Sequence, residues 1–221
     1  MFRKLFTAAL AVSIVGMAQG ASAAVIKFTE YKTWTSGSLS FSNGIESVDV
    51  FARNVNSDGS IRSGENPQIA SWTGGGIGIC NGVCGSTEAK VDGAINQEAA
   101  VLDFGALQVQ ITKVVFTNVG EGDDNFSLFN YGAGLGSAPT VSVLDKAIAG
   151  GKFNRAVAGF SSGVGSLFSI GALGDDDDFK IKKIVFTVVD TQQPAPVPLP
   201  AAGWMMLAGL GGLRLLRARK G

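Results

Sequence analysis

The segment from Asn54 to Glu65 has the residue types and spacing of a calcium-binding loop. Oxygen-bearing side chains occupy its first, third, fifth and twelfth positions, with glycine at the sixth; the candidate ligands are Asn54, Asn56, Asp58 and Glu65. The first position is asparagine where such loops carry a charged aspartate, and the flanks resemble strand and loop rather than helices. Because Asn and Asp-Gly also favour tight turns, we expect a polar hairpin loop, with a weak calcium site as the alternative.

Two acidic turns, Asp123-Asp124 and the run from Asp175 to Asp178, are further places where carboxylates could gather calcium. Four adjacent aspartates repel one another, so we expect an exposed loop that protects a neighbouring sheet edge from aggregation. A glycosidase needs two carboxylates about 5 to 9.5 Å apart across a cleft, and the sequence does not fix such a distance. We therefore expect no cofactor, with calcium as the alternative.

The chain has no histidine, which excludes Ser-His-Asp and Cys-His triads and any His-ligated metal. The glycine-rich segment from Gly74 to Ile79 lacks the Gly-Lys-Ser/Thr ending of a phosphate loop, and Asn81 replaces the third glycine of a dinucleotide-binding loop. We therefore predict that the protein is not an enzyme. A secreted, carboxylate-dependent glycan hydrolase is the alternative.

Cys80 and Cys84, the two cysteines of the chain, flank the turn residues Asn81 and Gly82. In an exported protein such a pair oxidises readily, so we expect a disulfide that closes a small loop. Metal binding by two thiols, or two buried free thiols, are the alternatives.

Between the two ends, residues 24–192 have the pattern of a single all-β domain. Runs of alternating or β-branched residues are separated by Gly, Asn, Asp and Ser, and predict an antiparallel β-sandwich or jelly roll. The expected strands are Val25 to Thr29, Ser38 to Phe41, Ile45 to Ala52, Ala99 to Phe104, Val109 to Val119, Phe126 to Asn130, Thr140 to Leu144, Ser166 to Ile170 and Phe179 to Val189.

Two local features add detail to this all-β pattern: a recurring strand sequence and a short helical turn. The run from Ile111 to Thr117 recurs as Ile181 to Thr187, which similar strands of one sandwich explain more simply than a duplication. The segment from Asp145 to Ala149 predicts one short helical turn.

The two ends of the chain have the composition of targeting segments. Residues 1–23 combine Arg3 and Lys4 with an apolar run and small residues at Ala21 and Ala23, which predicts a signal peptide cleaved after Ala23; an uncleaved membrane helix is the alternative. At the other end a Pro-rich spacer, 193–200, precedes a short apolar helix and a basic tail, 201–221. The basic residues of that tail, Arg214, Arg217, Arg219 and Lys220, should stay cytoplasmic.

The C-terminal order of motif, apolar helix and basic cluster resembles the VPLPA variant of the PEP-CTERM sorting signals. The motif residues are Val197, Pro198, Leu199, Pro200 and Ala201. The resemblance implies a Gram-negative bacterium, an inner-membrane intermediate, an exosortase that removes the tail, and delivery to the cell surface or extracellular matrix. A retained membrane anchor is the alternative.

A looser resemblance runs from Gly76 to Phe116, where GIGI, Val91-Asp92, Glu98 and VLDFG are similar to the β-sandwich ectodomain common among PEP-CTERM proteins. The family implies no established activity. Asp92 and Glu98 could share a cation, but we expect them to accept backbone N–H bonds. Trp34, Trp72 and Tyr31 could stack on sugars, although aromatic residues of a sandwich usually pack in its core.

The formal charge is unevenly distributed. All 18 acidic residues lie between the two ends, where only 12 basic residues remain, so this segment carries a formal charge of −6. An acidic domain is a poor partner for nucleic acid. We therefore expect an exported, surface-sorted, non-enzymatic β-sandwich that associates with exopolysaccharide.

Overall fold

The computed structural model describes residues 23–82, 84, 89–94, 96–120, 124–132, 134–136, 138–149 and 154–189. The predicted signal peptide, apart from Ala23, the spacer at 193–200 and the sorting helix and basic tail at 201–221 lie outside these residues. In the part that is described, no helix is long and apolar enough to cross a membrane.

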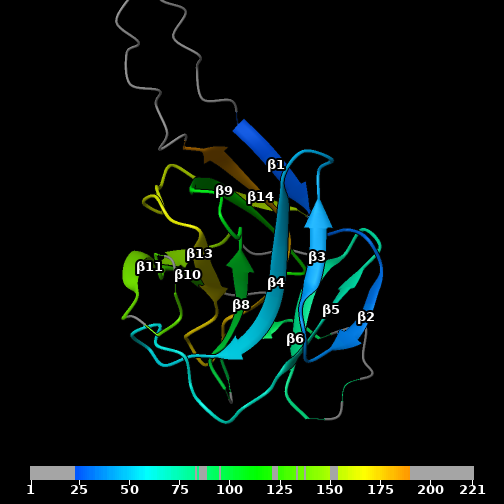
Figure 1. The fold of residues 1–221 in the computed structure, drawn as a ribbon. Coiled ribbons are helices and arrows are strands. Elements are labelled where there is room, and N and C mark those ends of the chain that lie inside the picture. Colours follow the sequence, from blue (N-terminus) through cyan, green and yellow to red (C-terminus); the bar gives the residue numbers. More distant parts are fainter. Residues whose placement is uncertain are drawn as a thin grey trace, which may run out of the picture. The chain divides into compact units, whose positions relative to one another are not determined.

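The described residues fold into two antiparallel sheets that pack together as a β-sandwich (Figure 1). The order of the first sheet is β12 (Arg155–Ala158), β9 (Val109–Thr117), β14 (Asp178–Val188), β6 (Gly76–Cys80), β5 (Gln68–Trp72) and β2 (Lys32–Thr35), and β1 (Ala23–Lys27) and β7 (Val91–Asp92) also pair with β14. The order of the second is β11 (Thr140–Ala147), β10 (Asn125–Asn130), β13 (Leu167–Gly171), β8 (Glu98–Asp103), β4 (Ser47–Asn54) and β3 (Leu39–Ser42).

Phenylalanine dominates the core between the sheets. Phe116 on β9 of the first sheet packs against Phe126 on β10 of the second, with ring centroids 4.9 Å apart. Phe186 on β14 packs edge-to-face on Phe104, which in turn contacts Phe168 on β13. Such aromatic contacts hold the two layers together because each ring removes a large apolar area from water.

The predicted all-β fold is confirmed, and each predicted run overlaps a strand, with ends that differ by up to three residues: β1, β3, β4, β8, β9, β10, β11, β13 and β14. The recurring sequences belong to β9 and β14, which are hydrogen-bonded neighbours with Val114 opposite Ile184. Two adjacent strands that face the same core select the same residue types, so their similarity needs no duplication.

The structure corrects one local prediction and adds five strands. The helical turn expected at Asp145 to Ala149 is wrong: β11 continues to Ala147 through an irregularity in its pairing with β10, where Asp145 has φ 44°. Such a bulge allows an extra residue within a ladder that stays extended. The sequence did not predict β2, β5, β6, β7 or β12.

Candidate functional site

A polar pocket of about 440 Å³ opens where β6, β7, β8 and β14 come together. The long strand β14 positions it, because β14 pairs with β7 at Asp178 and Asp92 and with β6 at Ile181 and Ile77. The lining residues are Ile79, Cys80, Asn81, Ala89, Lys90, Asp92, Asn96, Glu98 and Asp178.

Glu98, the first residue of β8, is a buried carboxyl group with a relative exposure of 5%. Its Oε1 accepts a hydrogen bond from Asn81 Nδ2 (2.5 Å), and its Oε2 accepts one from the backbone N–H of Asp92 (3.0 Å). Burial raises the pKa of Glu98 to about 8, and the charge of Asp92 adds to this, while the two hydrogen bonds oppose it. At neutral pH the carboxyl is therefore mostly protonated.

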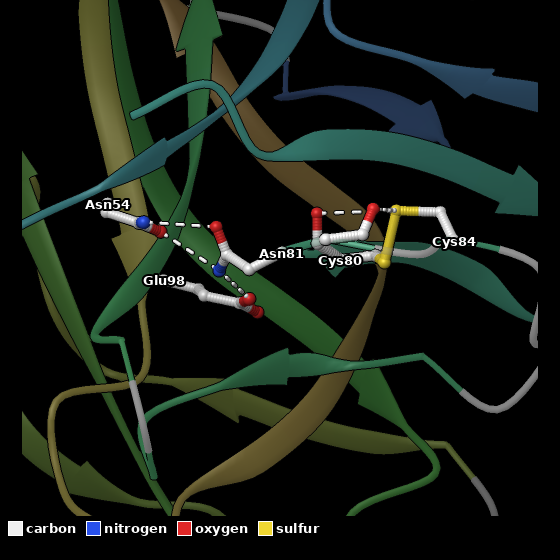
Figure 2. The surroundings of a disulfide bond; sticks show 6 residues. Asn54, Cys80, Asn81, Cys84 and Glu98 are labelled. Carbon is white, nitrogen blue, oxygen red and sulfur yellow. Dashed lines mark hydrogen bonds between the residues drawn. A yellow bond between two sulfur atoms is a disulfide. The ribbon is translucent and has the colours of Figure 1, made fainter. Parts of the chain in front are cut away.

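Asn54 connects this carboxyl to the 54–65 loop. Its amide exchanges two hydrogen bonds with the amide of Asn81 (3.1 and 3.2 Å) and also donates to Glu65 Oε2. Figure 2 shows Asn54, Asn81 and Glu98 as a connected group, with the disulfide on the far side of Asn81. Two of the four candidate calcium ligands thus form hydrogen bonds with each other.

The other two candidate ligands hold a turn. Asp58 Oδ1 accepts a hydrogen bond from the backbone N–H of Ser60 (2.9 Å), and Asn56 Nδ2 donates to Ser60 Oγ (2.8 Å). The ends of the loop meet in an antiparallel bridge between Val55 and Ile61. Among the described residues, no group of three or more His, Cys, Asp or Glu side chains is arranged to hold a metal ion.

Cys80 and Cys84 form the predicted disulfide, with their Cα atoms 5.8 Å apart. Cys80 ends β6 and lines the pocket, while Gly82 supplies the positive φ of 94° that the tight loop requires. The bond therefore fixes the segment that carries Asn81 beside Glu98.

Asp92 and Glu98 hold backbone groups, as the sequence analysis expected. Glu98 accepts the N–H of Asp92, and Asp92 Oδ1 accepts the N–H of Ala94 (2.7 Å). Each side chain stabilises the short β7 segment that forms one wall of the pocket.

The run from Asp175 to Asp178 is only partly the exposed loop expected, because it forms hydrogen bonds with the turn that contains Asp124. Asp124 Oδ1 accepts the N–H of Asp178, and Asp177 Oδ1 accepts the N–H of Asn125, both at 2.7 Å. Asp124 and Asp177 are each only 2% exposed. Burial raises the pKa of Asp124, with the negative charge of Asp178 adding to the effect. Asp175 and Asp176 are exposed as expected, and Asp123 lies outside the described residues.

Trp34 and Trp72 lie outside the buried core, in contrast to the expected core packing. Trp72 lies three residues after the core residue Ile69 on β5, so it faces away from the core. Its ring meets Trp34 edge-to-face at 5.4 Å, and Lys180 Nζ lies 4.2 Å from its centroid. Tyr31 is 65% exposed.

Sequence reasoning did not identify Lys90 or Asn96 as pocket residues. Lys90 Nζ contacts both carboxylate oxygens of Asp178 (2.8 and 2.7 Å), although the two residues are 88 positions apart. That contact depends on the pairing of β7 with β14, for which the sequence has no local signal.

The fold and the site define a β-sandwich with a disulfide beside an open polar pocket. Comparison with family models, with curated proteins and with solved structures gave no match.

Proposed function

We propose that this protein is an exported, non-enzymatic β-sandwich that binds exopolysaccharide at the cell surface or in the extracellular matrix. The observation that carries the proposal is the polar pocket between β6, β7, β8 and β14. We also assign the sandwich to the jelly-roll type, because the chain passes repeatedly between the two sheets from β8 to β14.

The chemistry of the pocket suits a carbohydrate. Sugar hydroxyls both donate and accept hydrogen bonds, and the amide of Asn96 offers both capacities. Asn81 already donates both of its side-chain N–H groups within the protein, so it offers an acceptor only. Asp92 adds acceptors, and Lys90 adds a donor. The half-buried Trp34 and Trp72 form a second feature of the kind that stacks on sugar rings, on the outer face of the first sheet.

A glycan array probed with residues 24–192 tests the proposal. We expect binding to one class of acidic or neutral polysaccharide, with Asn96→Ala weakening it about tenfold through loss of hydrogen bonds inside the pocket. Asn154→Ala is the matched control, since exposed Asn154 bonds to Lys182 and does not line this pocket. Equal binding by both variants would place the glycan elsewhere, and no binding to any glycan would refute the proposal.

One observation favours the hydrolase as a second candidate. A protonated Glu98 with Asp92 beside it in a pocket has the raised pKa that a general acid requires. However, both oxygens of Glu98 already bond to groups of the same chain. We expect no hydrolysis of any polysaccharide that the protein binds; turnover that disappears in Glu98→Gln would establish the hydrolase instead.

Delivery to the surface is the other half of the proposal, and it rests on the two ends of the sequence. A signal peptide at 1–23 exports the chain, and the basic tail holds it in the inner membrane with the acidic sandwich outside. An exosortase then acts at the VPLPA motif, Val197 to Ala201.

A further inference from the structure

One carboxylate oxygen of the buried acidic turns lacks a hydrogen-bond partner. Asp124 Oδ1 accepts the N–H of Asp178, but Asp124 Oδ2 is buried and has no partner among the described residues. Native proteins rarely leave a buried polar atom unsatisfied, because it has lost its water without a replacement. Asp124 Oδ2 is therefore available to bind a ligand.

Gly120 is the neighbour of both this oxygen and the carboxylate of Asp178. A methyl group on Gly120 would be 2.9 Å from Asp124 Oδ2 and 3.0 Å from Asp178 Oδ1. One oxygen of Asp124, just before β10, and one oxygen of Asp178, at the start of β14, thus lie beside Gly120 and close to the same point. Gly120 is not among the residues with positive φ, so its backbone conformation does not require glycine.

The charges around this point favour a cation. Asp124, Asp177 and Asp178 are the carboxylates of the cluster, and Lys90 is the ammonium group that contacts it. When all are ionised the group has a net charge of −2, which a divalent ion would neutralise. Calcium accepts carboxylate and water oxygens in flexible geometry, whereas magnesium requires a near-ideal octahedron.

We propose that the space beside Gly120 binds a calcium ion, with Asp124 Oδ2 and Asp178 Oδ1 as protein ligands and water completing the coordination. Two carboxylates with a lysine nearby make a weak site, of the millimolar kind used by extracellular modules. The ion would join the start of β10 in one sheet to the start of β14 in the other.

Calcium titration of the purified full-length chain, first stripped with a chelator, tests this site. Calcium chloride up to about 10 mM should raise the melting temperature saturably, while magnesium chloride at the same concentration should not. Asp124→Asn should abolish the shift. Asp58→Asn makes the same change in the hairpin loop and should retain it.

Lys90→Gln gives a test in which calcium binding is expected to become tighter rather than to disappear. Removing the competing positive charge should lower the calcium concentration at half-saturation several-fold, because like charges at this range repel. Calorimetric titration of the same variants measures calcium binding directly. It also applies to a variant whose melting temperature without calcium differs from that of the native protein. The proposal is overturned by an unsaturable or absent shift in the native protein, by an equal shift with magnesium, by a shift that survives Asp124→Asn, or by an unchanged midpoint in Lys90→Gln.

Discussion

Glu98 illustrates how the buried polar residues of this sandwich are used. Its two oxygens accept hydrogen bonds from the side chain of Asn81 and the backbone of Asp92, and Asn81 in turn bonds to Asn54. Glu98 thus joins the loop after β6 to β7, and Asn81 extends the network to the end of β4. Burial without a cationic partner raises its pKa, so the network is most stable with Glu98 protonated.

The stability of the protein should therefore contain a pH-dependent contribution from Glu98. Between about pH 4.5 and about pH 8 the native state holds this proton more tightly than the unfolded state, so the contribution falls as pH rises. The maximum slope for one group is about 1.4 kcal/mol per pH unit. Glu98→Gln imitates the protonated form and should lack this slope in urea unfolding measured from pH 5 to pH 9.

The informative quantity is the difference in unfolding free energy between the native protein and Glu98→Gln. Other carboxylates contribute equally to both proteins, so the difference isolates Glu98. The exposed Glu30→Gln serves as the matched control and should change with pH as the native protein does. A constant difference between Glu98→Gln and the native protein would show that Glu98 ionises normally.

Gly78 on β6 lets the pocket-lining residue Ala89 pack closely against this strand. A methyl group there would lie 2.2 Å from the carbonyl oxygen of Ala89 and 2.9 Å from Cζ3 of Trp72. Gly78→Ala should therefore displace the pocket-lining segment at Ala89 and destabilise the protein by about 1–3 kcal/mol. Chemical denaturation measures the loss. Gly44→Ala is not a matched control because of its positive φ, but Gly134→Ala, with open space around it, should cost little.

At the scale of strands, the sequence predicted elements whose alternation is visible and missed those that tertiary contacts impose. On β3, Leu39 and Phe41 alternate with exposed serines, and the strand was predicted correctly. On β6 the GIGIC sequence looks like a loop, because Gly78 leaves room for Trp72 and Ala89 rather than for a side chain of its own. The two-residue β7 is a strand because it pairs with β14, which lies far away in the sequence.

In the candidate site, too, the features that could be predicted are local in sequence, and those that were missed depend on tertiary contacts. The disulfide and the roles of Asp92 and Glu98 follow from residues close in sequence, so they could be predicted. The contact of Lys90 with Asp178 and the reciprocal bonds of the two acidic turns join residues more than 50 positions apart. Repulsion between neighbouring aspartates suggested exposure, but backbone N–H groups brought by another strand allow Asp177 to be buried.

The disulfide stabilises the loop after β6 more than the sandwich as a whole. It joins cysteines only four positions apart, so the chain-entropy model gives about 2 kcal/mol. Replacing both cysteines by serine should lower the unfolding free energy by about that amount and leave the far-ultraviolet circular dichroism of the sheets unchanged. Native protein should have no titratable thiol; two reactive thiols in exported material, or a variant that fails to fold, would contradict this account.

At the scale of the whole chain, the acidic and basic residues are unevenly distributed. The acidic residues lie between the ends, while Arg214, Arg217, Arg219 and Lys220 lie after the last apolar run. In the proposed sorting, the resistance of positive charges to translocation would keep this tail in the cytoplasm while the rest of the chain is exported.

The proposed sorting predicts that the C-terminal segment is a sorting signal that is cleaved off once the protein has been sorted. Mature protein from the cell surface should end within or next to Val197 to Ala201 and lack Trp204 to Gly221, which mass spectrometry of the intact protein measures. Deleting Val197 to Pro200 should leave the precursor in the inner membrane, because the exosortase would have no motif to cleave. Exchanging Gln192 for alanine, just before the spacer, is the control and should not affect processing. A surface fraction that still ends at Gly221 would instead make this segment a retained membrane anchor, since a chain cleaved at the motif cannot carry the basic tail.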